Sequence, residues 1–436
     1  MMRYIIACLA IAWSVQSIAG FDPVSFADEA RVPGEILITF TDGISHEDQD
    51  RILARHGAKV VRRFKTVNGV LARMPENHLF LYSAGILAEN KGITRVAPNR
   101  LFHLFAEPDD PRYESQYQHE AIQAPQAWDI STGSKDVVVA VIDSGIIDDH
   151  EDLAPNIWVN PGEDGLDAEG NNRRTNGIDD DGNGYIDDFR GWDFVQSDND
   201  PTDGMGHGTH CAGIIGAIGN NGVGVAGINW QVSLVSLRIF DNYGNAAPED
   251  RILAALEYAA MMGFPIVSNS WGGVPTRDES WGPESGDMTY EVIRNADKAL
   301  WVFAAGNSSA NNERTPVLPA TYDLDHIVSV AASTSRDRLA RFSNYGSESV
   351  DLMAPGDRIY STSVRSFFGS WYYRMSGTSM AAPVVSGAAA LLLSVYPDAD
   401  PAELKERLMN TVDPIRSVSS RLVSGGRLNL YRALTE

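Results

Sequence analysis

Three segments of this chain carry an acid, a histidine and a serine in settings that suit nucleophilic catalysis. Asp143 ends the apolar stretch VVVAVID, His207 lies in GMGHGTHCAG, and Ser379 lies in SGTSMAAP. A serine hydroxyl is a weak nucleophile at neutral pH, and it needs a base beside it and a carboxylate that orients the base. Asp143, His207 and Ser379 are therefore candidates for the carboxylate, the base and the nucleophile of an acyl-transfer site.

The surroundings of each candidate strengthen this interpretation. Glycines on both sides of His207 allow another segment to approach. Small residues leave the Ser379 hydroxyl accessible at the start of an apolar helix, whose N-terminus favours developing negative charge. Taken singly, a strand-end Asp is usually a turn residue, a His a hydrogen-bonded surface group and a Ser a helix cap. The order Asp, His, Ser makes the set far more specific than any one segment.

Five segments in a fixed order carry a family resemblance. VIDSG, GHGTHCAG, NSWGG, AAGN and SGTSMAAP resemble the motifs of the subtilisin-like serine proteases, from about Asp110 to Leu434. The resemblance implies an α/β fold, with a parallel sheet flanked by helices. It also implies a serine endopeptidase that hydrolyses peptide bonds through an acyl-enzyme on Ser379, with Asp143 as the orienting residue and His207 as general base and acid.

Asn307 is the fourth catalytic candidate. The resemblance implies that its side chain is one donor of the oxyanion hole and the backbone N–H of Ser379 the other. The residues alone suit this role, because Asn307 offers an amide donor after a tight turn at Gly306. The related sedolisin pattern places an Asp at the oxyanion position, and Asn307 with His207 argues against it. His210 could form a metal pair with His207, but the sequence offers no third ligand motif nearby.

The segment NSWGG resembles the family's edge strand for substrate, beside which an extended peptide adds through backbone hydrogen bonds. The resemblance implies a substrate-binding set at this edge and in the S1 pocket, which consists of Ser270, Trp271, Gly272, Ala304, Ala305 and Gly306. The segment from Val317 to Ala320 completes the expected pocket wall. None of these residues is charged, so we expect an apolar or aromatic residue before the scissile bond.

The acidic stretch NGIDDDGNGYIDDFRGWDF follows the spacing of an EF-hand calcium loop through nine positions. Oxygen ligands at positions one, three, five, seven and nine are Asp179, Asp181, Asn183, the carbonyl of Tyr185, and Asp187. Position twelve, which is a bidentate Glu in an EF-hand, is Arg190, and Asp188 is the substitute that the stretch offers. The stretch predicts calcium as a cofactor, with a solvated acidic loop as the alternative.

The family resemblance implies a second calcium site. Asp110, Asp152 in HEDLAPN, and Asn221 in GNNGVGVAG match positions at which members of the family ligate calcium. The backbone carbonyls of Val223 and Val225 would complete the set. From the residues alone these are ordinary loop positions, so this expectation rests on the resemblance and not on the spacing.

Five largely apolar runs, separated by helical stretches, predict a parallel sheet that is buried on both faces. The runs are DVVVAVID, VSLVSLRIF, FPIVSNSWG, LWVFAAGN and HIVSVAAS. Sites in such sheets form beyond the carboxyl ends of the strands, where Asp143, Ser270 and Asn307 lie. The apolar stretch from Pro383 to Tyr396 is short and interrupted, which predicts a buried helix and not a membrane span.

Residues 32–99 read as strand, helix, strand, strand, helix, strand, a small α+β unit of ferredoxin-like type, with the second helix at Leu79 to Asn90. This unit resembles the inhibitory prodomain of the same family, and an independent binding module is the alternative. The acidic, proline-containing stretch FAEPDDPR is the best boundary. We expect a signal peptide at 1–19, the prodomain at 20–107 and the peptidase domain at 108–436.

The first twenty residues carry Arg3, an apolar run and small residues before a plausible cut. This pattern predicts a signal peptide and a secreted protein, extracellular or periplasmic; a buried N-terminal helix is the alternative. The formal net charge of −23 argues against a nucleic-acid partner. We expect a monomer without a stable membrane span, made as a self-processing zymogen. Its expected partners are protein or peptide substrates and its own prodomain.

The sequence leaves two other functions open. The first is a catalytically silent, secreted calcium-binding or interaction protein on a protease scaffold, and the intact set of four catalytic candidates argues against it. The second is a processing protease with narrow targets, which would prefer basic residues. The sequence has no clear acidic S1 signature, yet the acid excess of the chain keeps this function open.

Overall fold

Two units make up the computed structural model, one spanning Met1–Leu104 and the other Phe105–Glu436. The structure describes residues 31–74, 90–100, 107–275, 281–282, 285–365 and 369–436. The expected signal peptide at 1–19 lies outside these ranges. All candidate catalytic and metal-binding residues belong to the second unit.

The described part of the first unit is a four-stranded antiparallel sheet with strand order β2-β3-β1-β4. Its elements are β1 (Arg31–Phe40), α3 (His46–Arg55), β2 (Lys59–Arg63), β3 (Gly69–Arg73) and β4 (Ile93–Arg100). Alternate residues of the central strand β1, namely Ile36, Ile38 and Phe40, are buried with Leu53 of α3. This strand order is the one expected of a ferredoxin-like unit. The expected second helix falls, except for Asn90, outside the described residues.

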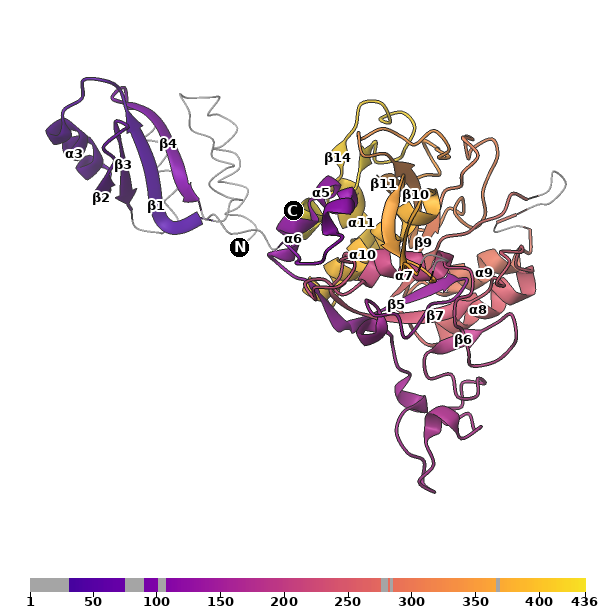
Figure 1. Cartoon of the computed structure of the whole chain (residues 1–436). Coiled ribbons are helices and arrows are strands. Elements are labelled where there is room, and N and C mark those ends of the chain that lie inside the picture. The colour runs from indigo at the N-terminus through magenta and orange to yellow at the C-terminus, as the bar shows by residue number, and fades with distance from the viewer. Residues whose placement is uncertain (1–30, 75–89, 101–106, 276–280, 283–284, 366–368) are drawn as a thin grey trace. The chain divides into compact units, whose positions relative to one another are not determined.

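The described residues of the second unit form a nine-stranded sheet (Figure 1). In spatial order its strands are β14 (Asp413–Pro414), β15 (Gly426–Arg427), β11 (Leu352–Pro355), β10 (Ile327–Ser333), β9 (Leu300–Ala304), β8 (Ile266–Asn269), β5 (Gly133–Asp143), β7 (Gln231–Arg238) and β6 (Gly191–Asp193). All pairs of neighbouring strands in this sheet are parallel, except the pair β14 and β15, which is antiparallel. The predicted parallel sheet is confirmed, and the five apolar runs form five adjacent strands, β10-β9-β8-β5-β7.

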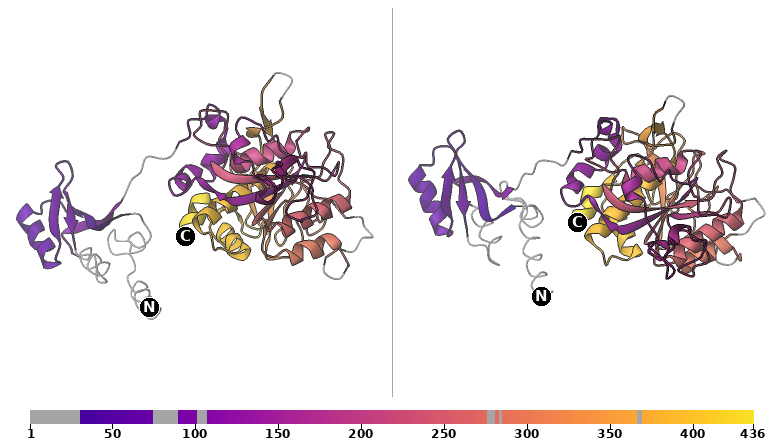
Figure 2. Two further views of the ribbon diagram at one scale, coloured as in Figure 1. Left: turned by 90° about the horizontal axis from the view of Figure 1, so that it is seen from below. Right: turned by 60° about the horizontal axis from the view of Figure 1, so that its bottom comes forward.

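Helices cover both faces of this sheet (Figures 1 and 2). On one face pack α5 (Tyr117–Ala121), α6 (Ala124–Trp128), α7 (His207–Gly216), α10 (Thr378–Val395), α11 (Pro401–Asn410) and α12 (Leu430–Thr435). On the other face pack α8 (Glu249–Met261) and α9 (Met288–Asn295). Strand β5 separates the two cores, because Val139 and Val141 point into the first, whereas Ala140 and Ile142 point into the second.

Helix α10 contains the apolar stretch that the sequence assigned to a buried helix. By length and composition this helix could cross a membrane, but 83% of its apolar window is buried inside the protein. It is therefore a core helix of the second unit, as predicted. The next helix, α11, is capped by Asp400, whose side chain accepts a hydrogen bond from the backbone N–H of Glu403.

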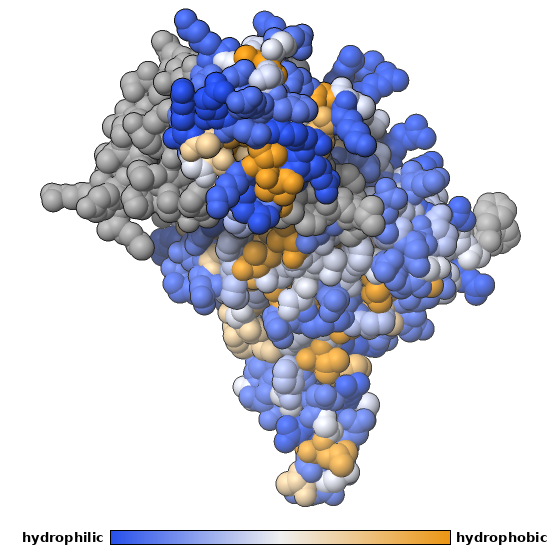
Figure 3. Space-filling view, turned by 90° about the vertical axis from the view of Figure 1, so that its left-hand side faces the viewer, coloured by the Kyte–Doolittle hydropathy of each residue, from blue (hydrophilic) through white to orange (hydrophobic). Residues whose placement is uncertain are grey.

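An insertion at residues 144–190 joins β5 to β6 and projects from the second unit (Figure 1). It is built from turns and three short helices, η2 (Ala154–Asn156), η3 (Pro161–Glu163) and η4 (Arg173–Thr175). Hydrophilic residues cover most of the projecting part, and hydrophobic ones lie near its end (Figure 3). The predicted calcium loop belongs to this β5–β6 insertion.

Elsewhere, η1 (Tyr113–Ser115) precedes α5, and β12 (Ile359–Thr362) pairs with β13 (Tyr372–Met375) beside α7.

Candidate active site and metal centres

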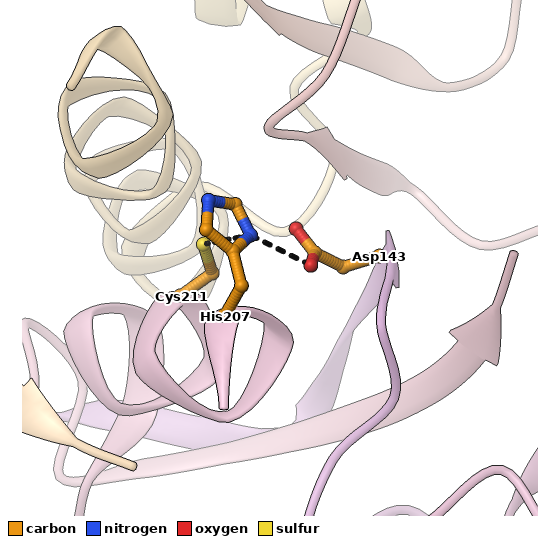
Figure 4. A group of neighbouring side chains, drawn as sticks. All are labelled: Asp143, His207 and Cys211. Carbon is orange, nitrogen blue, oxygen red and sulfur yellow. Dashed lines mark hydrogen bonds and ion pairs between the residues drawn. The ribbon is translucent and has the colours of Figure 1, made fainter. Parts of the chain in front are cut away.

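The last residue of β5 and the first residue of α7 form the centre of the site (Figure 4). The Nδ1–H of His207 donates a hydrogen bond to Oδ1 of Asp143 over 2.7 Å. The Asp143 side chain is 1% exposed and that of His207 is 23% exposed. Because the carboxylate fixes the ring in the Nδ1–H tautomer, Nε2 is left to accept a proton.

Glycine is required where α7 approaches the end of β5. A Cβ on Gly208 would lie 2.2 Å from the carbonyl oxygen of Gly145, so a larger residue cannot fit without moving the backbone. Gly206, the residue before the helix, has a φ of 95°, which only glycine adopts without strain. The glycines around His207 therefore allow the helix to begin directly against the strand that carries Asp143.

A second buried carboxylate, that of Asp203, organises the turn before α7. It accepts hydrogen bonds from three backbone N–H groups between residues 205 and 209 and from the hydroxyls of Ser144 and Thr209. The Ser144 hydroxyl oxygen also accepts a hydrogen bond from the N–H of Gly208. This network ties the end of β5 to the first turn of α7. The sequence analysis missed Asp203, whose one signal is an acidic residue four positions before the histidine.

Burial and charge act in opposite directions on His207. Burial disfavours the imidazolium, but the Asp143 carboxylate outweighs it and raises the pKa of His207 well above its ordinary value of 6.5. The neutral ring that can act as a base therefore predominates only above this raised pKa. His210, by contrast, is buried beside the carbonyl oxygens of Ile359 and Tyr373, each 3.2 Å from its Nε2, and burial lowers its pKa to about 3. It is a neutral structural residue.

Ser379 is the second residue of α10, which packs against α7. Cys211, one turn beyond His207, has its sulfur 4.0 Å from Nδ1 of His207 and 3.4 Å from the carbonyl oxygen of Ser379. The same carbonyl accepts a hydrogen bond from the Ser270 hydroxyl over 2.8 Å. One buried thiol thus contacts both residues, and the structure brings Asp143, His207 and Ser379 into one site.

Thr378, the first residue of α10, fixes the side chain of Asn307. Oδ1 of Asn307 accepts hydrogen bonds from the backbone N–H of Thr378 over 2.8 Å and from the Thr378 hydroxyl over 3.1 Å, so the amide presents Nδ2 as a donor. A Cβ built on Gly377 would lie 3.5 Å from the backbone nitrogen of Ser379 and 3.6 Å from Nδ2 of Asn307. Both donors therefore border the same small space, which is the arrangement that an oxyanion requires.

The predicted substrate-binding segments meet around Val317. Gly273, the last residue of the predicted edge segment, exchanges backbone hydrogen bonds of 2.9 and 2.8 Å with Leu318. A Cβ on Gly272 would lie 2.7 Å from the Val317 side chain, and one on Gly306 would lie 3.1 Å from it. The edge segment, the end of β9 and the segment at 317–320 therefore lie together.

Not every member of the predicted substrate set reaches the surface. Ala304 is 3% exposed and Ala305 is fully buried, whereas Gly306 after them is partly exposed. Trp271 donates its Nε1–H to the carbonyl oxygen of Ile142 over 3.0 Å and is partly buried. The two alanines can shape the pocket only from beneath, and Trp271 is held in one orientation.

The predicted calcium loop folds around its own side chains. Asp179 accepts hydrogen bonds from the N–H groups of residues 182, 183 and 184. Asp181 accepts one from the N–H of Asn183, whose Oδ1 accepts one from the N–H of Tyr185. Asp187 is buried, and its carboxylate also accepts a backbone hydrogen bond. The oxygens at the first positions therefore bind backbone N–H groups of the loop itself, while the Asp181 residue remains exposed.

The sequence analysis missed a carboxylate that faces this loop. Oε1 of the fully buried Glu163 accepts hydrogen bonds from the N–H groups of Asp180 and Asp181, over 2.7 and 3.3 Å. Its Oε2 is buried without a hydrogen-bond partner among the described residues. Burial, reinforced by the charges of Asp188 and Asp181, raises the pKa of Glu163 to about 7. Oxygens of Glu163, Asp179 and Asp181 lie within 4.8 Å of one another, a donor set that fits a calcium ion.

The residues of the second predicted metal site also come together. Asp152 is fully buried and accepts hydrogen bonds from Nδ2 of Asn221 over 2.9 Å and from the N–H of Val225 over 2.8 Å. The N–H of Val223 donates to Oδ1 of Asn221. Oδ1 of Asp110 is buried and has no partner in the described part of the chain. Burial, reinforced by the charge of Asp110, raises the pKa of Asp152 to about 7. Two close, buried carboxylates fit a cation here as well.

Comparisons with known proteins identify the family. Residues 134–431 match the Subtilase family, and residues 27–99 match the Fervidolysin N-terminal prodomain. Thermitase of Thermoactinomyces vulgaris is 34% identical over 75% of this chain and 99% of its own length. A thermophilic serine proteinase of Bacillus sp. (strain AK1) is 31% identical over 94% of this chain and 90% of its own. A solved protease structure from Pseudoalteromonas arctica superposes with a TM-score of 0.58, at 29% identity, and covers 76% of this chain and 99% of that one.

The chain belongs to the subtilase family. It is a subtilisin-like serine endopeptidase preceded by an N-terminal prodomain, and such a precursor is a zymogen. The resemblance that five short motifs carried is therefore confirmed over most of the chain.

Asp143→Asn tests the coupling of the carboxylate to the base. It should lower kcat by about 10⁴-fold, the loss known for the corresponding substitution in a chymotrypsin-like protease, because an amide favours the wrong tautomer of the ring. In the unchanged enzyme, activity should fall with falling pH at a midpoint above 6.5, where His207 becomes protonated. In the variant this midpoint should move to lower pH. A pH profile of kcat/KM with the same midpoint in both proteins would show that Asp143 does not control His207.

Asn307→Ala tests the oxyanion hole. It should lower kcat by roughly 10²–10³-fold, the magnitude known for the corresponding residue of subtilisin, while KM changes little. Ser308→Ala is a matched control, because it truncates the next residue, which is also exposed. Steady-state kinetics of both variants decide the matter: equal kcat values for the two would remove Asn307 from the reaction.

Proposed function

We propose that Ser379 is the nucleophile of this endopeptidase, His207 its general base and acid, and Asp143 the orienting carboxylate. The 2.7 Å hydrogen bond between Asp143 and His207, where α7 packs against α10, carries the proposal. Nε2 of His207 takes the Ser379 proton as Oγ attacks the scissile carbonyl, and the ring then gives this proton to the leaving amine. Water, activated by the same ring, attacks the resulting ester and restores the serine.

Negative charge on the carbonyl oxygen develops during both attacks. Nδ2 of Asn307 and the backbone N–H of Ser379 are the proposed donors to this oxygen, and the start of α10 adds its favourable dipole. Both donors are fixed before substrate arrives, Asn307 through Thr378 and Ser379 through the helix. Such donors stabilise the transition state more than the ground state, so they act on kcat.

For the substrate, we propose an extended peptide that pairs with the edge segment. The proposed binding set is Ser270, Trp271, Gly272, Ala304, Ala305 and Gly306, with the segment at 317–320. These residues are uncharged, which supports an apolar or aromatic residue before the scissile bond. A groove of about 900 Å³ extends from the edge segment and would take further side chains of the peptide. Its lining is mixed, with apolar residues such as Trp271 and Leu318 and the acidic residues Glu249, Asp250 and Asp287.

The proposed life history of the enzyme is that of a secreted, self-processing zymogen. The signal peptide at 1–19 is removed on export, the prodomain at 20–107 assists folding and then blocks the site, and residues 108–436 remain as the mature monomer. Two relatives are named as extracellular, an extracellular serine protease of Natrialba magadii and the extracellular basic protease of Dichelobacter nodosus. They support a location outside the cytoplasm, extracellular or periplasmic.

Calcium is the proposed cofactor, at two places. In the β5–β6 insertion the proposed ligands are Asp179, Asp181, Asn183, the carbonyl of Tyr185, and Asp187. At the second place they are Asp110, Asp152, Asn221 and the carbonyls of Val223 and Val225. When bound, calcium supplies positive charge to buried carboxylates and cross-links loops. The unpartnered buried oxygens of Glu163 and Asp110 support both places.

Ser379→Ala should abolish peptidase activity and leave the precursor unprocessed, since the same hydroxyl serves both reactions. The precursor should be visible by gel electrophoresis, and the variant should not react with a fluorophosphonate, which labels an activated serine. Ser376→Ala changes an exposed serine three residues earlier and should be processed and labelled normally. Full-rate peptide cleavage by pure Ser379→Ala protein would refute Ser379 as the nucleophile. If instead the unchanged protein neither cleaves peptides nor reacts with the fluorophosphonate, the silent calcium-binding scaffold is the better function.

Chelation should lower the melting temperature, because metal that binds only the folded state stabilises it by mass action. At free calcium 100 times Kd the contribution is about 2.7 kcal/mol per site. The measurement is a melt with calcium and with EDTA, in the Ser379→Ala background to prevent autolysis, repeated for Asp181→Ala. Calcium should raise the melting temperature of the Asp181→Ala protein by less. If calcium raises the melting temperatures of the parent and of the Asp181→Ala protein equally, or raises neither, the acidic loop is not a calcium site.

A further inference from the structure

The calcium loop lacks its closing ligand at the expected position. Position twelve counted from Asp179 is Arg190, whose guanidinium pairs with Asp148 and, over 2.9 Å, with Asp200. Arg190 therefore helps to hold the insertion together and cannot coordinate a cation. Calcium takes six to eight oxygen ligands, so the loop needs a carboxylate from another place.

Both carboxylate oxygens of Asp188, the substitute within the stretch, already accept hydrogen bonds from other side chains. Its Oδ1 accepts a hydrogen bond from Nδ2 of Asn160 over 2.8 Å. Its Oδ2 accepts one from Nδ2 of Asn183 over 2.9 Å and one from the hydroxyl of Tyr258 on α8. Asp188 is fully buried. These three donors anchor the insertion to the body of the second unit, and the carboxylate oxygen that lies with those of Asp179 and Asp181 belongs to Glu163 and not to Asp188.

Glu163, unlike Asp188, keeps one buried carboxylate oxygen without a hydrogen-bond partner among the described residues. It is the last residue of η3, sixteen positions before Asp179, and it is fully buried. Only one of its two oxygens is used, by the two backbone N–H groups of the loop, and Oε2 has no partner among the described residues. A buried carboxylate oxygen without a partner is costly, which makes its presence here informative.

Carboxylates gather around Glu163, and Arg173, which lies beside its neighbours in the chain, binds the Gly162 carbonyl and Asp180 instead. Oxygens of Asp179 and Asp181 lie within 4.8 Å of a Glu163 oxygen. Within the described ranges, no Lys or Arg forms an ion pair with any of these three carboxylates. Three carboxylates at this separation repel one another unless a cation lies between them. A divalent ion at the centre would relieve the repulsion and give Oε2 its partner.

We propose that Glu163 closes the calcium site through its Oε2, in place of the carboxylate that an EF-hand carries at position twelve. The inference rests on the proposed calcium loop and adds to it a ligand from outside the loop. The ion then joins η3 to the loop at 179–187, so that calcium orders the β5–β6 insertion as a whole. Asp188 has a different task, which is to hold the insertion on α8 with or without calcium.

The test is a calcium titration by isothermal calorimetry on the full chain carrying Ser379→Ala. The binding event that Asp181→Ala removes is the one that belongs to the loop. Glu163→Gln should weaken this event by at least roughly 10–100-fold, since loss of a mere supporting partner of a metal ligand already costs that much. Glu169→Gln, an exposed acid in the same insertion, is the matched control and should leave the affinity unchanged.

A second readout protects the test against a general folding defect. In EDTA, Glu163→Gln removes an unpartnered charge and keeps the side-chain volume, so the variant should melt no lower than its parent. In saturating calcium it should melt lower than its parent, because the parent alone gains the full binding energy. This reversal between the two conditions is expected of a ligand and not of a purely structural residue.

The outcomes separate the ligand from the loop. If the parent shows no event that Asp181→Ala removes, the proposed calcium loop fails and Glu163 with it. If the event is present and Glu163→Gln binds calcium as tightly as Glu169→Gln, the loop stands and the inference about Glu163 is overturned. The inference is also overturned if Asp188→Asn weakens binding while Glu163→Gln does not, because Asp188 would then be the closing ligand.

Discussion

The hydrogen bond between Asp143 and His207 is the constraint on which the rest of the structure depends. It requires the end of the central strand β5 and the start of α7 to meet at bonding distance, 2.7 Å between Oδ1 and Nδ1. Glycines at the contact, the left-handed turn before the helix and the buried Asp203 carboxylate all serve this approach. The parallel sheet supplies the remaining parts, because its strand ends bring Ser270 and Asn307 to the same edge, where α10 begins.

Buried carboxylates fall into three kinds in this strongly acidic protein. Asp193 pairs with the buried Arg238, and Asp203 is surrounded by hydrogen-bond donors. Glu163 and Asp110 each keep one buried oxygen without a partner and form no ion pair within the described ranges, whereas Asp143, which also keeps one such oxygen, pairs with His207. Since a buried charge is stable only when it is paired or fully hydrogen-bonded, the third kind is where an external cation is needed. The two proposed cation sites therefore lie in loops, apart from the hydrogen bond between Asp143 and His207 at the strand ends.

Local patterns were sufficient to predict the sheet and the catalytic candidates. Asp143 and Asn307 could be placed together because both lie at the ends of apolar runs and the ends of parallel strands meet, but the role of Asn307 was implied by the family resemblance. Asp203 and Glu163 could not, because their importance lies in contacts that the fold creates. Glu163 is sixteen residues from Asp179 and belongs to a different turn, so the count along the loop ended at Arg190 and pointed to Asp188. The burial of Ala304 and Ala305 likewise depends on packing that no linear motif records.

The central claim is that the Asp143 carboxylate raises the pKa of His207 and so sets the base of the reaction. The most direct measurement is an NMR titration of the ¹⁵N-labelled histidine rings in the Ser379→Ala protein. A His207→Gln reference identifies the signals of His207 among those of the nine histidines of the chain. We expect one ring, lost in the reference, to titrate well above pH 6.5 with its proton retained on Nδ1. A His207 ring that titrates at or below 6.5 would contradict the account.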